Sequence, residues 1–181
     1  MTHPNLLAID RHFDATPAFV YAIWSHPSLL ATWWGPEGHH LTTCEVDLRP
    51  GGTWRFNMER DGQPHWIHGT YHEVVPDQRL MFSYRFPEFG VQSIVSLRFK
   101  PEAQGTRMHF RQTGFPDAEN WRGHQGGWQS SFAILEDLLL RLHGIGSVYP
   151  TLPPAKVSGV AQDLAEARRR HDADHSAEAT P

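Results

Sequence analysis

The chain has 181 residues, which is enough for one domain of ordinary size with a remainder. Its formal net charge of −4 argues against binding to nucleic-acid phosphates, which requires a basic surface. No apolar run approaches the roughly 20 residues of a membrane-spanning helix, and we expect no membrane insertion and no secretory signal. Cys44 is the only cysteine, which excludes an intrachain disulfide and a cysteine-based zinc site and fits a cytoplasmic location.

The beginning of the chain predicts one strand followed by two short helices. Residues 6–13 alternate between apolar and polar side chains, as a half-buried strand does. Thr16 is suited to cap a first helix that ends near residue 26, because its hydroxyl can accept a free backbone N–H. We expect Ser28 to cap a second helix over residues 29–34 in the same way.

From about residue 41 the apolar period changes to two, which predicts six further strands. The hairpin signal Asp61-Gly62 separates two of them, since both positions of a tight hairpin turn need a left-handed backbone. Short turns join all six, and such a meander forms an antiparallel sheet with one solvated face. The expected strands lie within residues 41–48, 54–58, 66–75, 80–86, 95–99 and 108–112.

The last periodic segment predicts a long helix that begins at Asp117 and ends at Gly144. Gly126 and Gly127 interrupt it at a cost of roughly 1 kcal/mol each relative to alanine. Mid-helix glycines indicate close approach of another backbone or room left for something else. We expect a domain over residues 1–145 and a weakly ordered extension over 146–181. The apolar stripe of this helix consists of Trp121, Trp128, Phe132, Leu135, Leu138, Leu139 and Leu142.

This order of elements predicts an α+β protein in which a curved, antiparallel, seven-stranded sheet wraps around the long C-terminal helix. The sequence resembles the helix-grip fold of the SRPBCC (START-like) superfamily, and within it the branch named after activators of the heat-shock protein 90 ATPase. The resemblance covers about residues 5 to 143. Its motifs are Arg11-His12-Phe13-Asp14-Ala15-Thr16-Pro17, Leu30 to Gly38 with Trp33-Trp34-Gly35-Pro36, Asp47-Leu48-Arg49-Pro50-Gly51-Gly52-Thr53-Trp54, Gly69-Thr70-Tyr71-His72-Glu73-Val74, Arg79-Leu80, Gly105-Thr106-Arg107 and Gly126-Gly127-Trp128.

The resemblance implies a cavity between the sheet and the long helix, and it points to a small apolar or amphipathic molecule as the partner. Of the adjacent indoles Trp33 and Trp34, we expect one in the core and the other at the rim of this cavity, because helix neighbours point about 100° apart. The loop 35–40 is a candidate lid. The predicted ligand-binding residues are Trp33, Trp34, Trp54, Phe56, His68, Phe82, Tyr84, Phe110, Gln112, Trp128 and Phe132.

Two other functions remain open at the level of the sequence. The same pocket could host an enzyme that uses His68 with Tyr84 for acid–base chemistry on an aromatic or polyketide-like substrate. The chain could instead regulate a chaperone ATPase. We favour non-catalytic binding and expect no catalytic residue, no cofactor and no metal site, with the chain as a monomer or homodimer.

Overall fold

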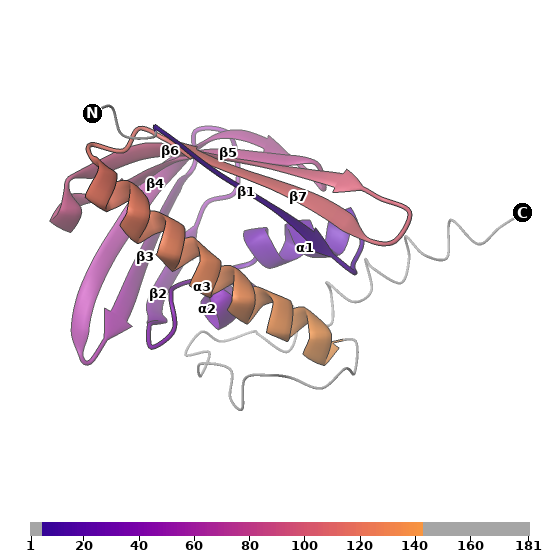
Figure 1. Ribbon diagram of the computed structural model, residues 1–181, viewed down its shortest axis with the longest axis horizontal. Coiled ribbons are helices and arrows are strands. Elements are labelled where there is room, and N and C mark those ends of the chain that lie inside the picture. The colour runs from indigo at the N-terminus through magenta and orange to yellow at the C-terminus, as the bar shows by residue number, and fades with distance from the viewer. Residues whose placement is uncertain (1–4, 143–181) are drawn as a thin grey trace, which may run out of the picture.

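The computed structural model describes residues 5–142 and has the predicted helix-grip architecture (Figure 1). The predicted extension over residues 146–181 lies outside the described residues. The elements are β1 (Leu6–Phe13), α1 (Pro17–Ser25), α2 (Pro27–Trp33), β2 (His40–Val46), β3 (Thr53–Arg60), β4 (Gln63–Val75), β5 (Arg79–Phe86), the 3-10 turn η1 (Pro87–Phe89), β6 (Val91–Pro101), β7 (Thr106–Thr113) and α3 (Ala118–Leu142).

The seven strands form one antiparallel sheet in the order β1-β7-β6-β5-β4-β3-β2. Consecutive strands from β2 to β7 are neighbours, as the predicted meander requires. Helices α1 and α2 carry the chain from β1, at one edge, to β2 at the other edge. Figure 1 shows α3 crossing the sheet on the side that also holds these two helices. Among residues 5–142, no helix combines the length and apolar character needed to cross a membrane.

Local sequence signals explain where these elements begin and turn. Asp61 and Gly62 have φ angles of 51° and 75°, so the predicted hairpin turn between β3 and β4 is confirmed. The hydroxyl of Thr16 accepts the backbone N–H of Phe19 at 3.3 Å and caps α1 as predicted. The prediction for Ser28 was wrong: α2 begins at Pro27, two residues earlier than predicted, and His26 is its N-cap, because Pro27 has a fixed φ that suits a first helical turn.

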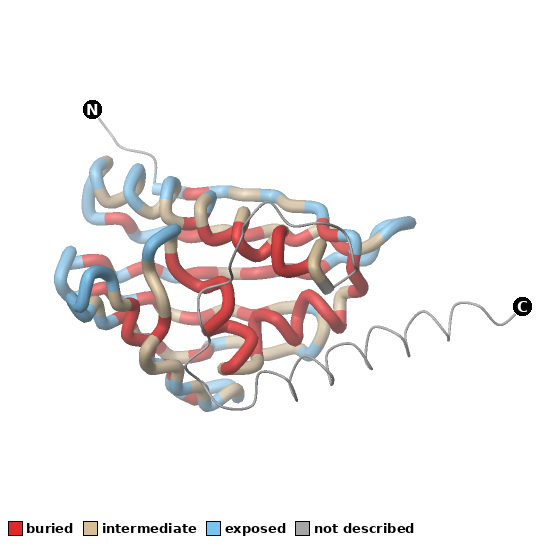
Figure 2. Tube along the Cα trace, turned by 90° about the horizontal axis from the view of Figure 1, so that it is seen from below, coloured by how far each residue is buried: buried red, intermediate tan, exposed pale blue. Residues whose placement is uncertain are grey.

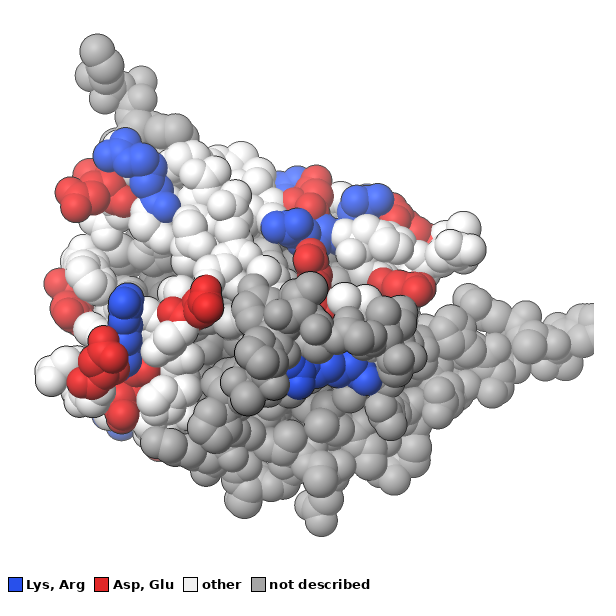
Figure 3. Space-filling model, turned by 60° about the horizontal axis from the view of Figure 1, so that its bottom comes forward, with Lys and Arg blue, Asp and Glu red and all other residues white. Residues whose placement is uncertain are grey.

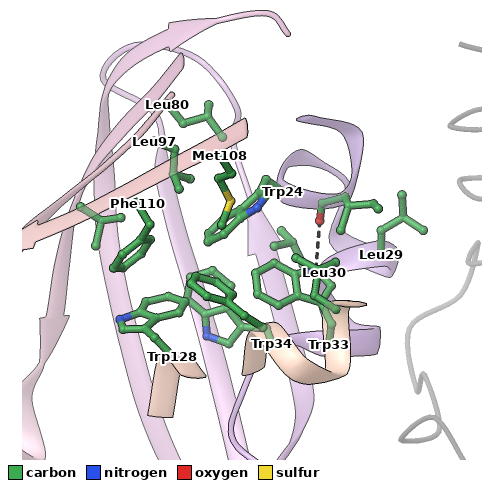
Figure 4. Packing of buried hydrophobic residues seen from close by; sticks show 14 of the residues in the cluster. Trp24, Leu29, Leu30, Trp33, Trp34, Leu80, Leu97, Met108, Phe110 and Trp128 are labelled. Carbon is green, nitrogen blue, oxygen red and sulfur yellow. Dashed lines mark hydrogen bonds between the residues drawn. The ribbon is translucent and has the colours of Figure 1, made fainter. Parts of the chain in front are cut away.

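A cluster of aromatic rings forms the centre of the core (Figure 4). The ring of Trp24 lies 4.7 Å from Trp33 and 6.1 Å from Trp128, so α1, α2 and α3 meet at one point. Phe110 of β7 adds its ring 4.7 Å from that of Trp128 and joins the sheet to the long helix. The indole N–H of Trp33 donates to the carbonyl oxygen of Ile23 at 3.1 Å, which satisfies the one polar group of this buried ring.

The two halves of α3 differ in burial. The C-terminal half lies in the core, whereas none of residues 118–127 is fully buried, as Figure 2 shows along the tube. The helix is therefore anchored along its C-terminal half, and its first turns contact the sheet through a few side chains, among them Trp121, whose indole N–H donates to the backbone oxygen of Leu6 on β1 at 3.1 Å. The buried residues of the anchored half are Trp128, Ser131, Phe132, Ile134, Leu135, Asp137, Leu138 and Leu139.

The close approach of β4 and β5 at Gly69 yields a stability prediction. A Cβ atom at this position would overlap the carbonyl oxygen of Ser83 and lie 2.6 Å from the indole nitrogen of Trp54. We expect Gly69→Ala to lower the free energy of unfolding by about 1–3 kcal/mol, measured by urea denaturation, because the strands must separate to admit the methyl group. Gly126→Ala is the control, since its Cβ would meet nothing within 4 Å. Equal stability of the two variants would contradict this account.

Candidate ligand pocket

A pocket of about 500 Å³ lies between the N-terminal half of α3 and the sheet. Its walls come from the N-terminal half of α3, the segment that follows α2, strands β3 and β5, and η1. Figure 3 shows this end of the molecule hollowed, at the left of the view, with both acidic and basic side chains around the hollow. The lining residues are Trp34, Gly35, Pro36, Met58, Tyr84, Phe86, Phe89, Glu119, Asn120, Gly123, His124, Gly127, Trp128 and Ser131.

Two indoles form the inner wall and are held in fixed orientations. The rings of Trp34 and Trp128 lie 5.0 Å apart at an angle of 80°. The indole N–H of Trp128 donates to the side-chain oxygen of Gln112 at 2.7 Å, and the amide nitrogen of Gln112 donates to the hydroxyl of Ser93 at 2.8 Å. Because the polar atoms of Trp128, Gln112 and Ser93 in these two hydrogen bonds are paired with one another, Trp128 has one defined position.

Glycines of α3 leave the room that the pocket occupies. A Cβ atom on Gly123 would meet nothing within 4 Å, and one on Gly127 would meet only the ring of Pro36, at 3.7 Å. The predicted alternatives for Gly126 and Gly127 were close backbone approach or vacant room. No backbone atom of another element comes near either glycine; Gly127 borders the pocket, whereas Gly126 is exposed and lies outside its lining.

His124 is the most buried ionisable side chain of the lining after Tyr84. Its Nδ1 donates to the carbonyl oxygen of Asn120 at 2.9 Å, while its Nε2 is buried with no hydrogen-bond partner. Burial lowers the pKa of His124, so the ring is neutral near pH 7 with its lone pair on Nε2. Burial likewise raises the pKa of Tyr84, whose ring lies 5.5 Å from that of His124, so the phenol keeps its proton.

Only some of the predicted binding residues line the pocket, and the others lie in the core or on the outer face of the sheet. Trp34, Tyr84 and Trp128 line the pocket. Trp33 is fully buried in the core, and thus the two adjacent indoles separate into a core residue and a wall residue. Four of the predicted residues surround a much smaller hollow deeper in the core, namely Trp34, Trp54, Phe56 and Phe82. Three others are buried outside both sets of lining residues, namely Phe110, Gln112 and Phe132.

The expectation that His68 faces the cavity was wrong. His68 pairs in register with the exposed residues Arg55 and Arg85, so it lies on the outer face of the sheet. The inner row of β4 holds Ile67 and its period-two neighbours instead. His68 and Tyr84 therefore lie on opposite faces, and the acid–base pair that the enzyme alternative required is not formed.

The sequence analysis missed the contribution of the first turns of α3. Two rows at i, i+4 spacing face the pocket, and a helix repeats its faces at that spacing, so the signal was present. One row consists of Asn120, His124 and Trp128, and the other of Gly123, Gly127 and Ser131. The predicted lid also meets α3: the backbone N–H of Glu37 donates to the hydroxyl of Ser130 at 2.9 Å.

Comparisons with known proteins agree with this geometry. The family model described as Activator of Hsp90 ATPase homolog 1-like protein matches residues 14–140. The chain belongs to this family. No curated protein matches it. The predicted resemblance is thereby confirmed for the family and for its helix-grip, SRPBCC-type fold.

This chain matches solved structures of similar proteins over nearly the whole length of those proteins. A crystal structure of a protein from Chromobacterium violaceum is 32% identical to this chain, with a TM-score of 0.67, over 75% of this chain and 97% of that chain. The AHSA1 protein from Silicibacter pomeroyi is 28% identical, with a TM-score of 0.68, over 75% of this chain and 98% of that one.

The lowered pKa of His124 predicts a loss of stability in mild acid. As the pH falls below about 6.5, an unfolded histidine binds a proton before the buried ring does, so the free energy of unfolding falls with pH. His124→Gln removes this titration while keeping a polar side chain. We expect the wild type to lose more stability than His124→Gln between about pH 7.5 and about pH 5.5 in urea denaturation.

His72→Gln serves as the matched control, because His72 is an exposed histidine of β4. This variant should keep the pH dependence of the wild type. The account fails if removal of the buried ring leaves the slope against pH unchanged.

Proposed function

We propose that this chain is a non-catalytic binding protein for a small apolar or amphipathic molecule, held in the pocket between α3 and the sheet. The observation that carries the proposal is the pocket itself. Its volume of about 500 Å³ falls within the range of roughly 300–1,000 Å³ that is typical of small-molecule sites. Membership of an SRPBCC-type family agrees with this proposal, because the fold is that of a ligand-binding domain family.

The chemistry of the walls favours an apolar body in the occupant. Aromatic side chains from three different elements face the space, namely Trp34, Tyr84 and Trp128. Each Å² of apolar surface that leaves water contributes about 25 cal/mol to binding. Because these rings are already packed against core residues, little side-chain freedom is lost when a ligand enters.

The polar groups of the pocket are few, and apart from the hydroxyl of Tyr84 on β5 they come from α3. Asn120, His124 and Ser131 all project from α3, opposite the aromatic ring of Phe86 on β5. A mostly apolar pocket with a few placed polar groups binds molecules that have one polar end. This distribution supports an amphipathic ligand whose polar end faces the helix.

Filling the pocket from α3 tests the proposal. Gly127→Leu places a branched side chain where only the ring of Pro36 lies near, so it occupies the pocket without meeting backbone. We expect this variant to lose binding of N-phenyl-1-naphthylamine, a neutral probe that fluoresces in apolar surroundings, by at least about tenfold. Its stability should not fall, because leucine is a better helix former than glycine by roughly 0.5–1 kcal/mol.

The adjacent glycine supplies the control. Gly126 is exposed, does not line the pocket, and has open space around a built Cβ. Gly126→Leu should therefore bind the probe as the wild type does. If Gly127→Leu and Gly126→Leu bind the probe equally well, the pocket is not the binding site.

A further inference from the structure

We propose that the occupant of this pocket is a cationic amphipath, an apolar molecule whose protonated amine lies beside Glu119 at the mouth. This inference rests on the proposed function and adds the charge of the ligand to it. Four features of the pocket support it: its net charge, the state of its hydrogen-bond donors, its aromatic walls and the capping of the helix end beside it.

Glu119 is the only charged side chain among the described residues that line the pocket. It is exposed in the first turn of α3, and no ion pair or hydrogen bond in the described part of the chain uses its carboxylate. An unpaired carboxylate at the mouth of an apolar pocket attracts cations and repels anions. Neither Arg60 nor Arg122, the exposed arginine three residues along α3, lines the pocket, and the guanidinium of Arg60 is paired with Asp61 at 3.5 Å.

The polar side chains of the lining present acceptors to the pocket. Donors of three of them are engaged by α3 or its cap: Asn120 donates one of its two amide N–H groups to Asp117 at 3.0 Å, His124 donates to the Asn120 carbonyl at 2.9 Å, and Ser131 donates to the Gly127 carbonyl at 2.9 Å. The indole N–H of Trp128 is engaged with Gln112. A ligand carboxylate would find few donors here, whereas an ammonium group finds acceptors.

Three neutral side-chain donors of the lining remain, namely the second amide N–H of Asn120, the hydroxyl of Tyr84 and the indole of Trp34. None of them carries the positive charge that a buried anion requires. The faces of aromatic rings carry negative potential and attract cations, tryptophan most strongly. The same side chains that form the apolar wall are thus compatible with a positive charge at its edge.

The N-terminus of α3 does not reverse this preference. A helix N-terminus attracts anions through its free N–H groups. Here the carboxylate of Asp117 already occupies that position, because it accepts the backbone N–H of Asn120 at 2.8 Å. With Glu119 in the same turn, the end of the helix that borders the pocket is already supplied with negative charge.

Three probes that share a naphthalene ring separate charge from apolar contact. They are 1-naphthylmethylamine, 1-naphthylmethanol and 1-naphthoate, measured near neutral pH by displacement of N-phenyl-1-naphthylamine. We expect the amine to bind roughly fivefold more tightly than the alcohol, since a unit charge about 4 Å away contributes about 1 kcal/mol in water. The naphthoate should bind most weakly, and added salt should reduce the advantage of the amine.

Glu119→Gln removes the charge and keeps the shape of the side chain. This variant should bind the amine and the alcohol with equal affinity, while its affinity for the alcohol stays that of the wild type. Glu45→Gln, an exposed residue of β2 outside the lining, changes the net charge equally and should keep the preference for the amine.

The outcomes distinguish this inference from the proposed function. If the alcohol binds but the amine shows no advantage, or if Glu119→Gln retains that advantage, the inference is overturned while the pocket remains a binding site. If none of the probes binds the wild type, the proposed function fails, and the inference fails with it.

Discussion

The anchoring of one half of α3 by aromatic rings is the contact on which the rest of this structure depends. Trp24, Trp128 and Phe110 bring a short helix, the long helix and the sheet into one cluster. Beyond Trp128 toward its C-terminus, α3 is buried, and before it the helix is not. Before Trp128 the helix meets the sheet through single side chains, with Trp121 on the backbone of β1 and His124 beside Tyr84 of β5. The pocket lies between these less buried turns of α3 and strands β3 and β5.

Trp128 serves the fold and the pocket at once. One side of its ring packs on Phe110 and Phe132 of the core, and the same side chain lines the pocket. Its hydrogen bond to Gln112 ties it to β7 at a buried position where an unpaired N–H would cost about 1–3 kcal/mol. The wall of the pocket is therefore built from the most strongly held part of the domain, which favours a preformed site.

The sequence was sufficient to predict the order of the elements and the inner face of most strands, because apolar side chains alternate there with charged ones. It was not sufficient for β4, where both faces carry an aromatic residue and a histidine: His65 and Tyr71 on one, Trp66 and His68 on the other. Hydrophobicity does not distinguish two such rows. The inner row contains Gly69, which is covered by the indole of Trp54. Because glycine has no side chain, it does not mark the buried face in the alternation of apolar and polar residues. The contribution of Asn120 and His124 depended on the direction of α3, which is a property of the packing.

The glycines of α3 also divide the helix energetically. Gly123, Gly126 and Gly127 each reduce helix stability by roughly 1 kcal/mol relative to alanine, and this segment has little buried surface to compensate. Its hydrogen-bonded turns consequently open at a lower free energy than those of the anchored half. For the ligand that we propose, brief local fraying of this segment would open a way into the pocket while the aromatic centre of the domain remains intact.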